Sequence, residues 1–196
     1  MFRESISKED MAVLPLKQFT GDIILVETSG MVKLAVRYLS KCPILGFDTE
    51  TKPSFKKGEN HKVALLQLAS ENKAFLFRIQ KTGLPPSITG LLTDPVLLKA
   101  GVAIHDDIKA LQKVRHFKPA GFIELQDHAR RVGIKDFSLK KLCAIVLNLR
   151  ISKSQQLSNW ETDNLSDQQL VYAATDAYMS LKIFEKLSNF IPDDRI

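Results

Sequence analysis

The stretch "ILGFDTET", residues 44–51, combines the pattern of a buried strand with two acidic side chains. Asp48 and Glu50 occupy alternate positions, and alternate residues of a strand point to the same face. Two neighbouring carboxylates repel each other, and burial strengthens the repulsion. A divalent cation would remove this conflict, and oxygen ligands without a nearby thiol or His cluster favour magnesium or manganese. The alternative is that both acids lie exposed at the tip of the strand.

The composition indicates one soluble globular domain. The chain has 196 residues, of which 44% are hydrophobic and 26% charged. No segment approaches the roughly 20 apolar residues of a membrane span, and the N-terminus lacks the apolar core of a secretory signal. We therefore expect no membrane partner and a cytoplasmic location, or a nuclear one in a eukaryote. The only cysteines, Cys42 and Cys143, are expected to be free thiols.

The charge balance favours an anionic partner. The formal net charge is +6, and Lys or Arg side chains near phosphates release condensed counterions on binding. The basic residues gather at 56–62, 113–118, 130–135 and 140–141. Each of these patches taken alone is equally consistent with an ordinary solvated surface.

The order of the apolar segments predicts an α/β fold with a mixed sheet. We expect strands at 22–27, 44–51, 62–70, 73–79, 97–104 and 121–126. We expect helices at 29–41, shortly after the prolines near 85, and at 106–116, 126–132, 138–147 and 166–189. The strands at 62–70 and 73–79 are close enough to form a hairpin. Residues 149–164 form a long polar connection, and connections of that length are often functional or mobile.

The domain organisation is expected to be simple. Residues 1–22 show no clear period and form an N-terminal extension, either a tail or a segment that wraps the surface. Residues 23–192 form the single domain.

A second acidic site lies in "GVAIHDDIKAL", residues 101–111, where an apolar strand gives way to a helix. One of the two aspartates, Asp106 or Asp107, is expected to cap that helix. Two adjacent aspartates exceed what a cap requires, so the other is a candidate for a functional role.

A third site lies in "YAATDAY", residues 172–178, within the last predicted helix. Ser166 and Gln169 have the spacing of a capping box at its start. Tyr172 and Asp176 are one turn apart and lie about 110–150° from the apolar stripe of the helix. This flank is expected to form the wall of a cleft; the alternative is a Tyr–Asp pair on a wet surface.

Three segments in this order resemble the motifs of the DEDDy family of 3′–5′ exonucleases, which includes ribonuclease D and the Werner syndrome exonuclease domain. The segments are "FDTE", "GVAIHDDIKAL" and "LSNWETDNLSDQQLVYAATDAY". The resemblance extends from about residue 23 to 190 and implies a ribonuclease H-like mixed sheet flanked by helices.

The resemblance assigns site residues position by position. The expected metal ligands are Asp48, Glu50, Asp107 and Asp176, with Tyr172 as the fifth catalytic residue. Asp107 is preferred over Asp106 because Leu111 provides the large apolar residue four positions later. Asp106 is left with a capping or supporting role, and Trp160 with a structural one.

The chemistry implied by the resemblance is two-metal hydrolysis of a phosphodiester bond. Two Mg²⁺ or Mn²⁺ ions about 4 Å apart activate a water and stabilise the leaving oxygen. Asp48 would bridge the ions, Glu50 and Asp176 would complete the site that activates water, and Asp107 would hold the second ion. Tyr172 would orient the attacking water. The expected partner is a single-stranded 3′ end of DNA or RNA, from which nucleoside 5′-monophosphates are released.

Two alternatives stay open at this point. The chain could be an inactive member of the same fold that only binds nucleic acid, or a different ribonuclease H-like enzyme such as a resolvase or integrase core. The sequence does not distinguish DNA from RNA as substrate, because that choice depends on contacts to the 2′-hydroxyl group. It identifies no protein partner.

Overall fold

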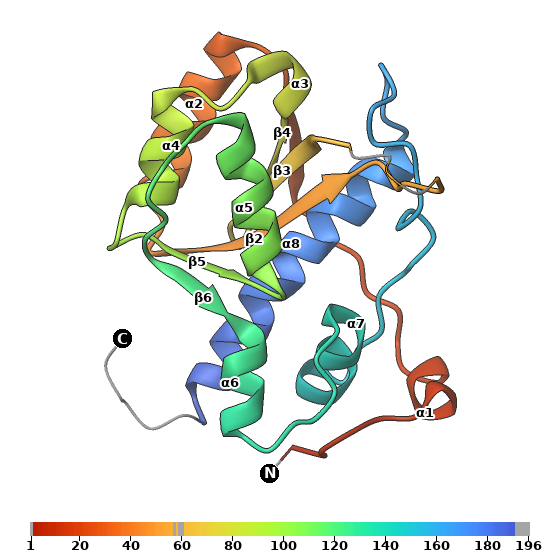
Figure 1. Ribbon diagram of the computed structural model, residues 1–196. Coiled ribbons are helices and arrows are strands. Elements are labelled where there is room, and N and C mark those ends of the chain that lie inside the picture. Colours follow the sequence, from red (N-terminus) through yellow and green to blue (C-terminus); the bar gives the residue numbers. More distant parts are fainter. Residues whose placement is uncertain (1, 57, 59–60, 191–196) are drawn as a thin grey trace.

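The computed structural model describes residues 2–56, 58 and 61–190 of the chain. One mixed sheet of six strands, in the order β1-β4-β3-β2-β5-β6, is flanked by helices (Figure 1). The strands are β1 (Asp22–Val26), β2 (Ile44–Thr51), β3 (Val63–Ala69), β4 (Lys73–Arg78), β5 (Leu98–Gly101) and β6 (Phe122–Glu124). The helices are α1 (Lys8–Ala12), α2 (Ser29–Leu39), α3 (Ile79–Thr82), α4 (Pro86–Thr93), α5 (Ile104–Val114), α6 (Leu125–Arg131), α7 (Leu139–Leu142), a π-helical turn η1 (Cys143–Leu147) and α8 (Asp167–Ser188). The predicted mixed α/β sheet is confirmed; the predicted domain end at residue 192 and part of the basic patch at 56–62 lie outside the described residues.

The strand pairing leaves part of β2 open on one side. β2 and β3 are antiparallel, and β3 and β4 form the expected antiparallel hairpin. β5 pairs in parallel with β2, but only along Ile44–Gly46. Beyond Gly46, no strand among the described residues pairs with the β5 side of β2, and this is the section with Asp48 and Glu50. Ligands of open α/β sheets bind in such places, outside the carboxyl ends of parallel strands.

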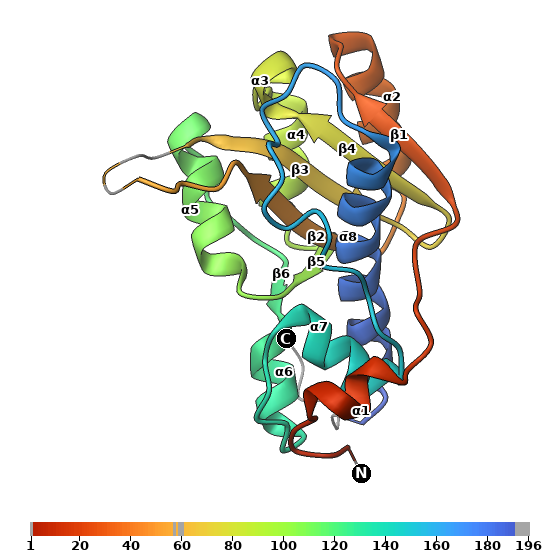
Figure 2. The ribbon, with the colours of Figure 1, turned by 90° about the vertical axis from the view of Figure 1, so that its right-hand side faces the viewer.

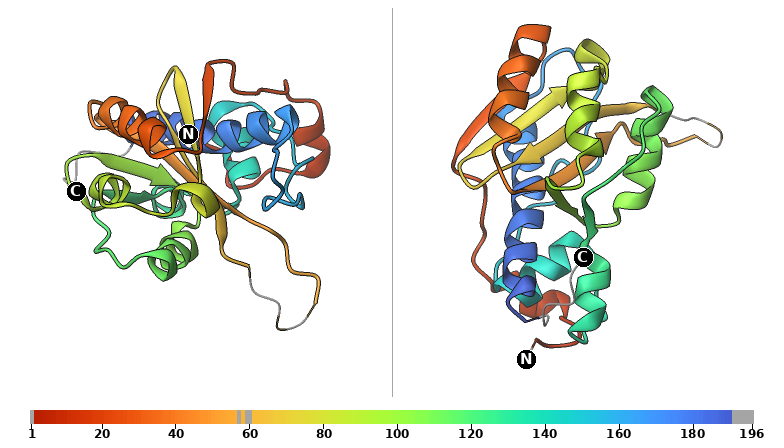
Figure 3. Two further views of the ribbon diagram at one scale, coloured as in Figure 1. Left: turned by 90° about the horizontal axis from the view of Figure 1, so that it is seen from above. Right: turned by 90° about the vertical axis from the view of Figure 1, so that its left-hand side faces the viewer.

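The two faces of the sheet are covered by different helices. Helices α2, α4 and α5 cover one face, and α8 crosses the other (Figure 3). The side chain of Phe47 packs in the cluster beneath α2, α4 and α5. Because side chains alternate along a strand, Gly46, Asp48 and Glu50 face α8 instead.

Gly46 allows α8 to lie directly on β2. A Cβ atom at this position would stand 1.8 Å from the carbonyl oxygen of Ala177. The helix meets the sheet there with small buried side chains, Ala173, Ala174 and Ala177. The close approach places the turn of α8 that contains Asp176 against the acidic section of β2.

The C-terminal half of α8 packs into a second apolar cluster. Met179 and Ile183 are both buried in this cluster, with residues of α6, α7 and η1. The capping box of Ser166 and Gln169 at the start of α8 is confirmed.

The N-terminal segment is a surface wrap, and it contains the short helix α1. The Ile6 amide donates to Asp136 at 3.0 Å, and Ile6 and Met11 are buried in the second apolar cluster. Arg150 pairs with the segment through backbone hydrogen bonds to Pro15 and Lys17 at 2.9 Å each. The sequence left a tail and a wrap both open, because the contacts that hold the segment come from residues more than a hundred positions away.

Two further features are the length and apolar character of the helices and the state of the two cysteines. Among residues 2–56, 58 and 61–190, no helix combines the length and apolar character needed to cross a membrane. Cys42 and Cys143 are both free thiols, as expected.

Candidate active site

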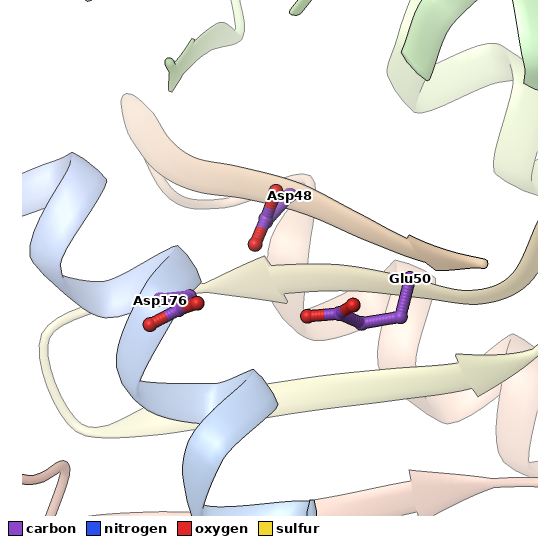
Figure 4. A group of neighbouring side chains, drawn as sticks. All are labelled: Asp48, Glu50 and Asp176. Atoms are coloured by element: carbon purple, nitrogen blue, oxygen red, sulfur yellow. The ribbon is translucent and has the colours of Figure 1, made fainter. Parts of the chain in front are cut away.

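Three carboxylates converge between the sheet and α8. Asp48 and Glu50 project from β2, and Asp176 projects from α8 towards them (Figure 4). One oxygen of each lies within 4.8 Å of the others. The alternation along β2 places the first two on one face, and Gly46 lets the third approach them.

Burial and mutual repulsion hold protons on this cluster. Burial, followed by the charges of Asp176 and Asp107, raises the pKa of Asp48 well above its ordinary value. The same effects raise the pKa of Glu50 to about 10, with Asp48 as the largest charge contribution. Burial raises the pKa of Asp176 to about 7. Without a cation, the three groups therefore cannot all be ionised near neutral pH.

The polar atoms around the cluster fit a divalent cation. The Oδ1 atom of Asp176 is buried and has no hydrogen-bond partner among the described residues. Gln67 pairs with Asp48 across β2 and β3, so both side chains share a face, and both polar atoms of the buried Gln67 also lack partners. A buried polar atom left unpaired costs about 1–3 kcal/mol. Three carboxylates without a thiol suit magnesium or manganese.

Tyr172 lies beside the cluster, one helical turn before Asp176. Its hydroxyl contacts the Asp176 carboxylate, and this contact favours the charged form of the acid. Burial, followed by the charges of Asp176 and Glu50, raises the tyrosine pKa further above its ordinary value. The ring packs against the fully buried Trp160, with 6.0 Å between ring centroids. Tyr172 is therefore a neutral, positioned hydrogen-bond donor, and Trp160 supports its ring.

Asp107 is not part of the three-carboxylate group. The Thr49 hydroxyl donates to it at 2.5 Å, and Thr49 faces away from α8 because it alternates with Asp48 and Glu50. Burial raises the pKa of Asp107 to about 6, and the Thr49 hydrogen bond opposes that shift. Asp107 is near enough for its charge to raise the pKa of Asp48 and of Glu50.

The predicted aspartate cap of α5 is wrong. The Glu124 carboxylate accepts hydrogen bonds from the amides of Ala103 and Ile104, at 2.9 and 2.8 Å. Ala103 itself adopts a left-handed conformation with φ 58° and makes no side-chain cap. Asp106 is exposed and forms an ion pair with Lys109. It does not cap the helix, because a carboxylate from another element already occupies the helix start.

A cleft of about 490 Å³ opens in front of the cluster. Asp48, Glu50, Tyr172 and Asp176 line it together with two lysines, Lys140 and Lys153. The polar connection at 149–164 forms part of the cleft lining through residues 151–153 and Gln156. The cleft is therefore lined by both acidic and basic side chains.

The connection at 149–164 is held in place by a residue that the sequence analysis missed. The Arg78 side chain is buried and donates to the carbonyls of Thr162 and Asp163, at 2.6 and 3.1 Å. Gly46, Thr49 and Glu124 were missed as well. Only Gly46 had a signal, because a glycine within a strand often marks a close backbone approach.

The chain is similar in sequence to known exonucleases. Residues 23–192 match the profile of a family described as "3'-5' exonuclease". The "Bifunctional 3'-5' exonuclease/ATP-dependent helicase WRN" of Mus musculus is 34% identical over 90% of this chain, which spans 13% of that protein. A "3'-5' exonuclease" of Arabidopsis thaliana is 31% identical over 91% of this chain and 67% of its own length.

The fold is similar to that of a solved exonuclease domain. The Nibbler EXO domain of Aedes aegypti superposes with a TM-score of 0.79 at 24% identity, over 88% of this chain and 91% of that one. Since the family profile covers nearly the whole chain and the fold agrees, the chain belongs to the 3′–5′ exonuclease family.

Proposed function

We propose that the chain is a metal-dependent 3′–5′ exonuclease that removes nucleoside 5′-monophosphates from a single-stranded 3′ end. The observation that carries the proposal is the convergence of Asp48, Glu50 and Asp176 beside Tyr172, at the open end of β2. The shifted pKa values of these acids support a cation as the missing partner. Family membership supports the direction of attack, from the 3′ end.

Two Mg²⁺ or Mn²⁺ ions are the proposed cofactors. Asp48, Glu50 and Asp176 would hold one, and Asp48 and Asp107 the other. When bound, the ions supply Lewis-acid stabilisation of the charge that develops at the phosphate. Asp107 contributes from the far side of β2, so its hydrogen bond with Thr49 sets its position before the cofactor binds.

The protein groups have complementary tasks around the scissile phosphate. Tyr172 stays protonated at neutral pH. While its hydroxyl donates to Asp176, the same oxygen accepts a hydrogen bond from the attacking water and orients it without removing a proton. Trp160 fixes the ring that carries this hydroxyl. Lys140 and Lys153, which line the same cleft, attract the phosphates that the carboxylates would repel.

Both DNA and RNA are candidate substrates. A ribonuclease D of Trypanosoma brucei, whose structure superposes with a TM-score of 0.76 at 22% identity, has been solved in complex with RNA U12. That structure supports the ability of the fold to bind RNA.

The deciding experiment is digestion of 5′-labelled linear strands and internally labelled circular strands of DNA and RNA with Mg²⁺, with Mn²⁺ or with excess chelator. We expect shortening from the 3′ end with either ion, release of nucleoside 5′-monophosphates, and no cleavage of circles. Persistent cleavage in excess chelator would overturn the metal requirement, and cleavage of circles would indicate an internal nuclease. Binding of the strand without cleavage in either ion would favour the inactive, strand-binding alternative.

A further inference from the structure

A second groove continues the cleft away from the acidic cluster. Its volume is about 450 Å³, and its lining includes five basic side chains: Lys8, Lys140, Lys141, Arg150 and Lys153. No Asp or Glu is found among the described residues that line it. We refer to these five side chains and the space between them as the basic groove.

The basic groove and the cleft share one wall. Ser138, Lys140, Ile151 and Lys153 line both spaces. A chain bound in the cleft can therefore extend into the basic groove without crossing the molecular surface elsewhere. The far side of the groove is formed by α1, which lies beside α7 and the connection that leads to α8 (Figure 2).

Two of the five basic side chains, Lys8 and Lys153, are available to a ligand, whereas two others already have partners within the protein. Lys141 is paired with Asp136 at 2.6 Å, and Arg150 donates through Nε to the carbonyl of Leu14 at 2.9 Å. Lys8 and Lys153 are exposed, and they form no ion pair with another described residue. An exposed cation without a partner is ready to exchange its counterions for a phosphate.

The N-terminal segment is fixed firmly enough to form a binding wall. The amide of Lys135 donates to the Glu4 carbonyl at 2.7 Å, and the amide of Phe19 donates to the Thr175 hydroxyl at 3.0 Å. Met11 of α1 is buried in the second apolar cluster. Lys8 is thus held on a helix that is attached to the domain on both sides.

We propose that the basic groove binds the sugar–phosphate backbone of the strand several nucleotides upstream of the bond that is cut. The proposal rests on the proposed exonuclease function, since the cleft must hold the 3′ end for the groove to hold the upstream strand. Binding there requires the phosphate charges and no particular base sequence. The N-terminal segment is then part of the substrate-binding surface.

Lys8→Gln is the test variant, because Lys8 lies in the groove and does not line the cleft. Lys8→Arg keeps the charge, and Lys33→Gln removes an exposed charge from α2, at the far end of the molecule. Affinity is measured by fluorescence anisotropy in chelator, with a strand of about 12 nucleotides and with a dinucleotide. Turnover of both substrates is measured in Mg²⁺, and thermal unfolding shows whether each variant is folded.

We expect Lys8→Gln to weaken binding of the long strand about 3- to 10-fold and to lower the salt dependence of log K by about 0.7, the value for one phosphate contact on a single strand. Dinucleotide turnover should be unchanged, and Lys8→Arg and Lys33→Gln should behave as wild type. Unchanged affinity and salt dependence in a folded Lys8→Gln variant would refute strand binding by the basic groove, whether or not the wild type is active. If the wild type does not cleave but Lys8→Gln still weakens strand binding, the exonuclease function is refuted and strand binding by the basic groove is supported.

Discussion

The two faces of β2 hold their acidic partners in different ways. On the α8 face, Asp48, Glu50 and Asp176 are close together and mutually repulsive; Asp176 is buried, and Asp48 and Glu50 are partly buried. On the opposite face, Asp107 has a hydrogen-bond donor of its own in Thr49, and its pKa is raised only to about 6. The negative charges of the three carboxylates need a cation to balance them, whereas Asp107 has a hydrogen-bond donor within the protein.

This difference indicates where the site is preformed. The three carboxylates on the α8 face are placed by backbone contacts that a ligand cannot easily change, because Gly46 and Ala177 are in direct contact. Asp107 is placed by one side-chain hydrogen bond, which can be exchanged. We therefore expect the first metal site to form without substrate and the second to depend on a change at Asp107.

The largest expected effect comes from removing a member of the preformed group. Asp176→Asn should lower single-turnover cleavage by more than about 10⁴-fold, because it removes a ligand from a charge-stabilising site worth several kcal/mol. The variant should still fold, since the buried amide is neutral and similar in shape. Cleavage within about tenfold of wild type would show that the three carboxylates do not act as one metal site.

The opposite face is tested by a pair of adjacent aspartates. Asp107→Asn should slow cleavage by about 10³-fold, while Asp106→Asn should change it by less than about twofold, because Asp106 is exposed and pairs with Lys109. Both rates are measured in the same Mg²⁺ titration. Equal losses, or the reverse order, would remove Asp107 from the site.

Tyr172→Phe removes the hydroxyl and keeps the ring, so it tests the role of the hydroxyl alone. The ring contact with Trp160 should persist, so folding and strand affinity should be unchanged. A single positioning contact is typically worth about 10²–10⁴-fold in rate, and we expect the single-turnover loss in that range. A wild-type rate would make Tyr172 a packing residue only.

Gly46→Ala tests whether close packing holds the α8 face together. The added Cβ would meet the Ala177 carbonyl, a backbone atom that cannot move aside, so we expect a loss of about 3 kcal/mol or more in the free energy of unfolding. Gly90→Ala is the matched control, because nothing lies within 4 Å of a Cβ there. In helix α4 this control should stabilise by about 0.5–1 kcal/mol. A Gly46→Ala variant as stable as wild type would contradict the direct contact between β2 and α8.

The smallest effect concerns pH and metal in the unmodified protein. Folding raises the pKa of Asp107, Asp176 and Glu50, so the metal-free folded state binds more protons than the unfolded state. The stability associated with these protons is complete below about pH 4, the unfolded pKa range, and is lost as the pH rises through about 6, 7 and 10. Mg²⁺ or Mn²⁺ should therefore raise the melting temperature more at pH 8 than at pH 5, by about 2–4 °C for each kcal/mol of added stability. Equal shifts at both pH values, or a larger shift at pH 5, would indicate that the metal binds elsewhere; Asp176→Asn is the control.

The sequence by itself determined the elements and the chemical identity of the site. Period-two and helical patterns depend on local backbone geometry, so they located β2, the β3–β4 hairpin and α8. The same geometry placed Asp48 with Glu50 on one face, and Tyr172 one turn before Asp176. The order of the motifs was sufficient to indicate the exonuclease family.

Only the tertiary structure decided how these elements meet. The contact of Gly46 with Ala177, the cap of α5 by Glu124, and the attachment of the N-terminal segment all join residues that are distant in the chain. Such contacts depend on which surfaces are complementary once the sheet has formed, and a local pattern contains no information on that. The resemblance already implied a separate role for Asp107, but only the structure shows how it is held: its neighbour is a threonine on the opposite face of the strand.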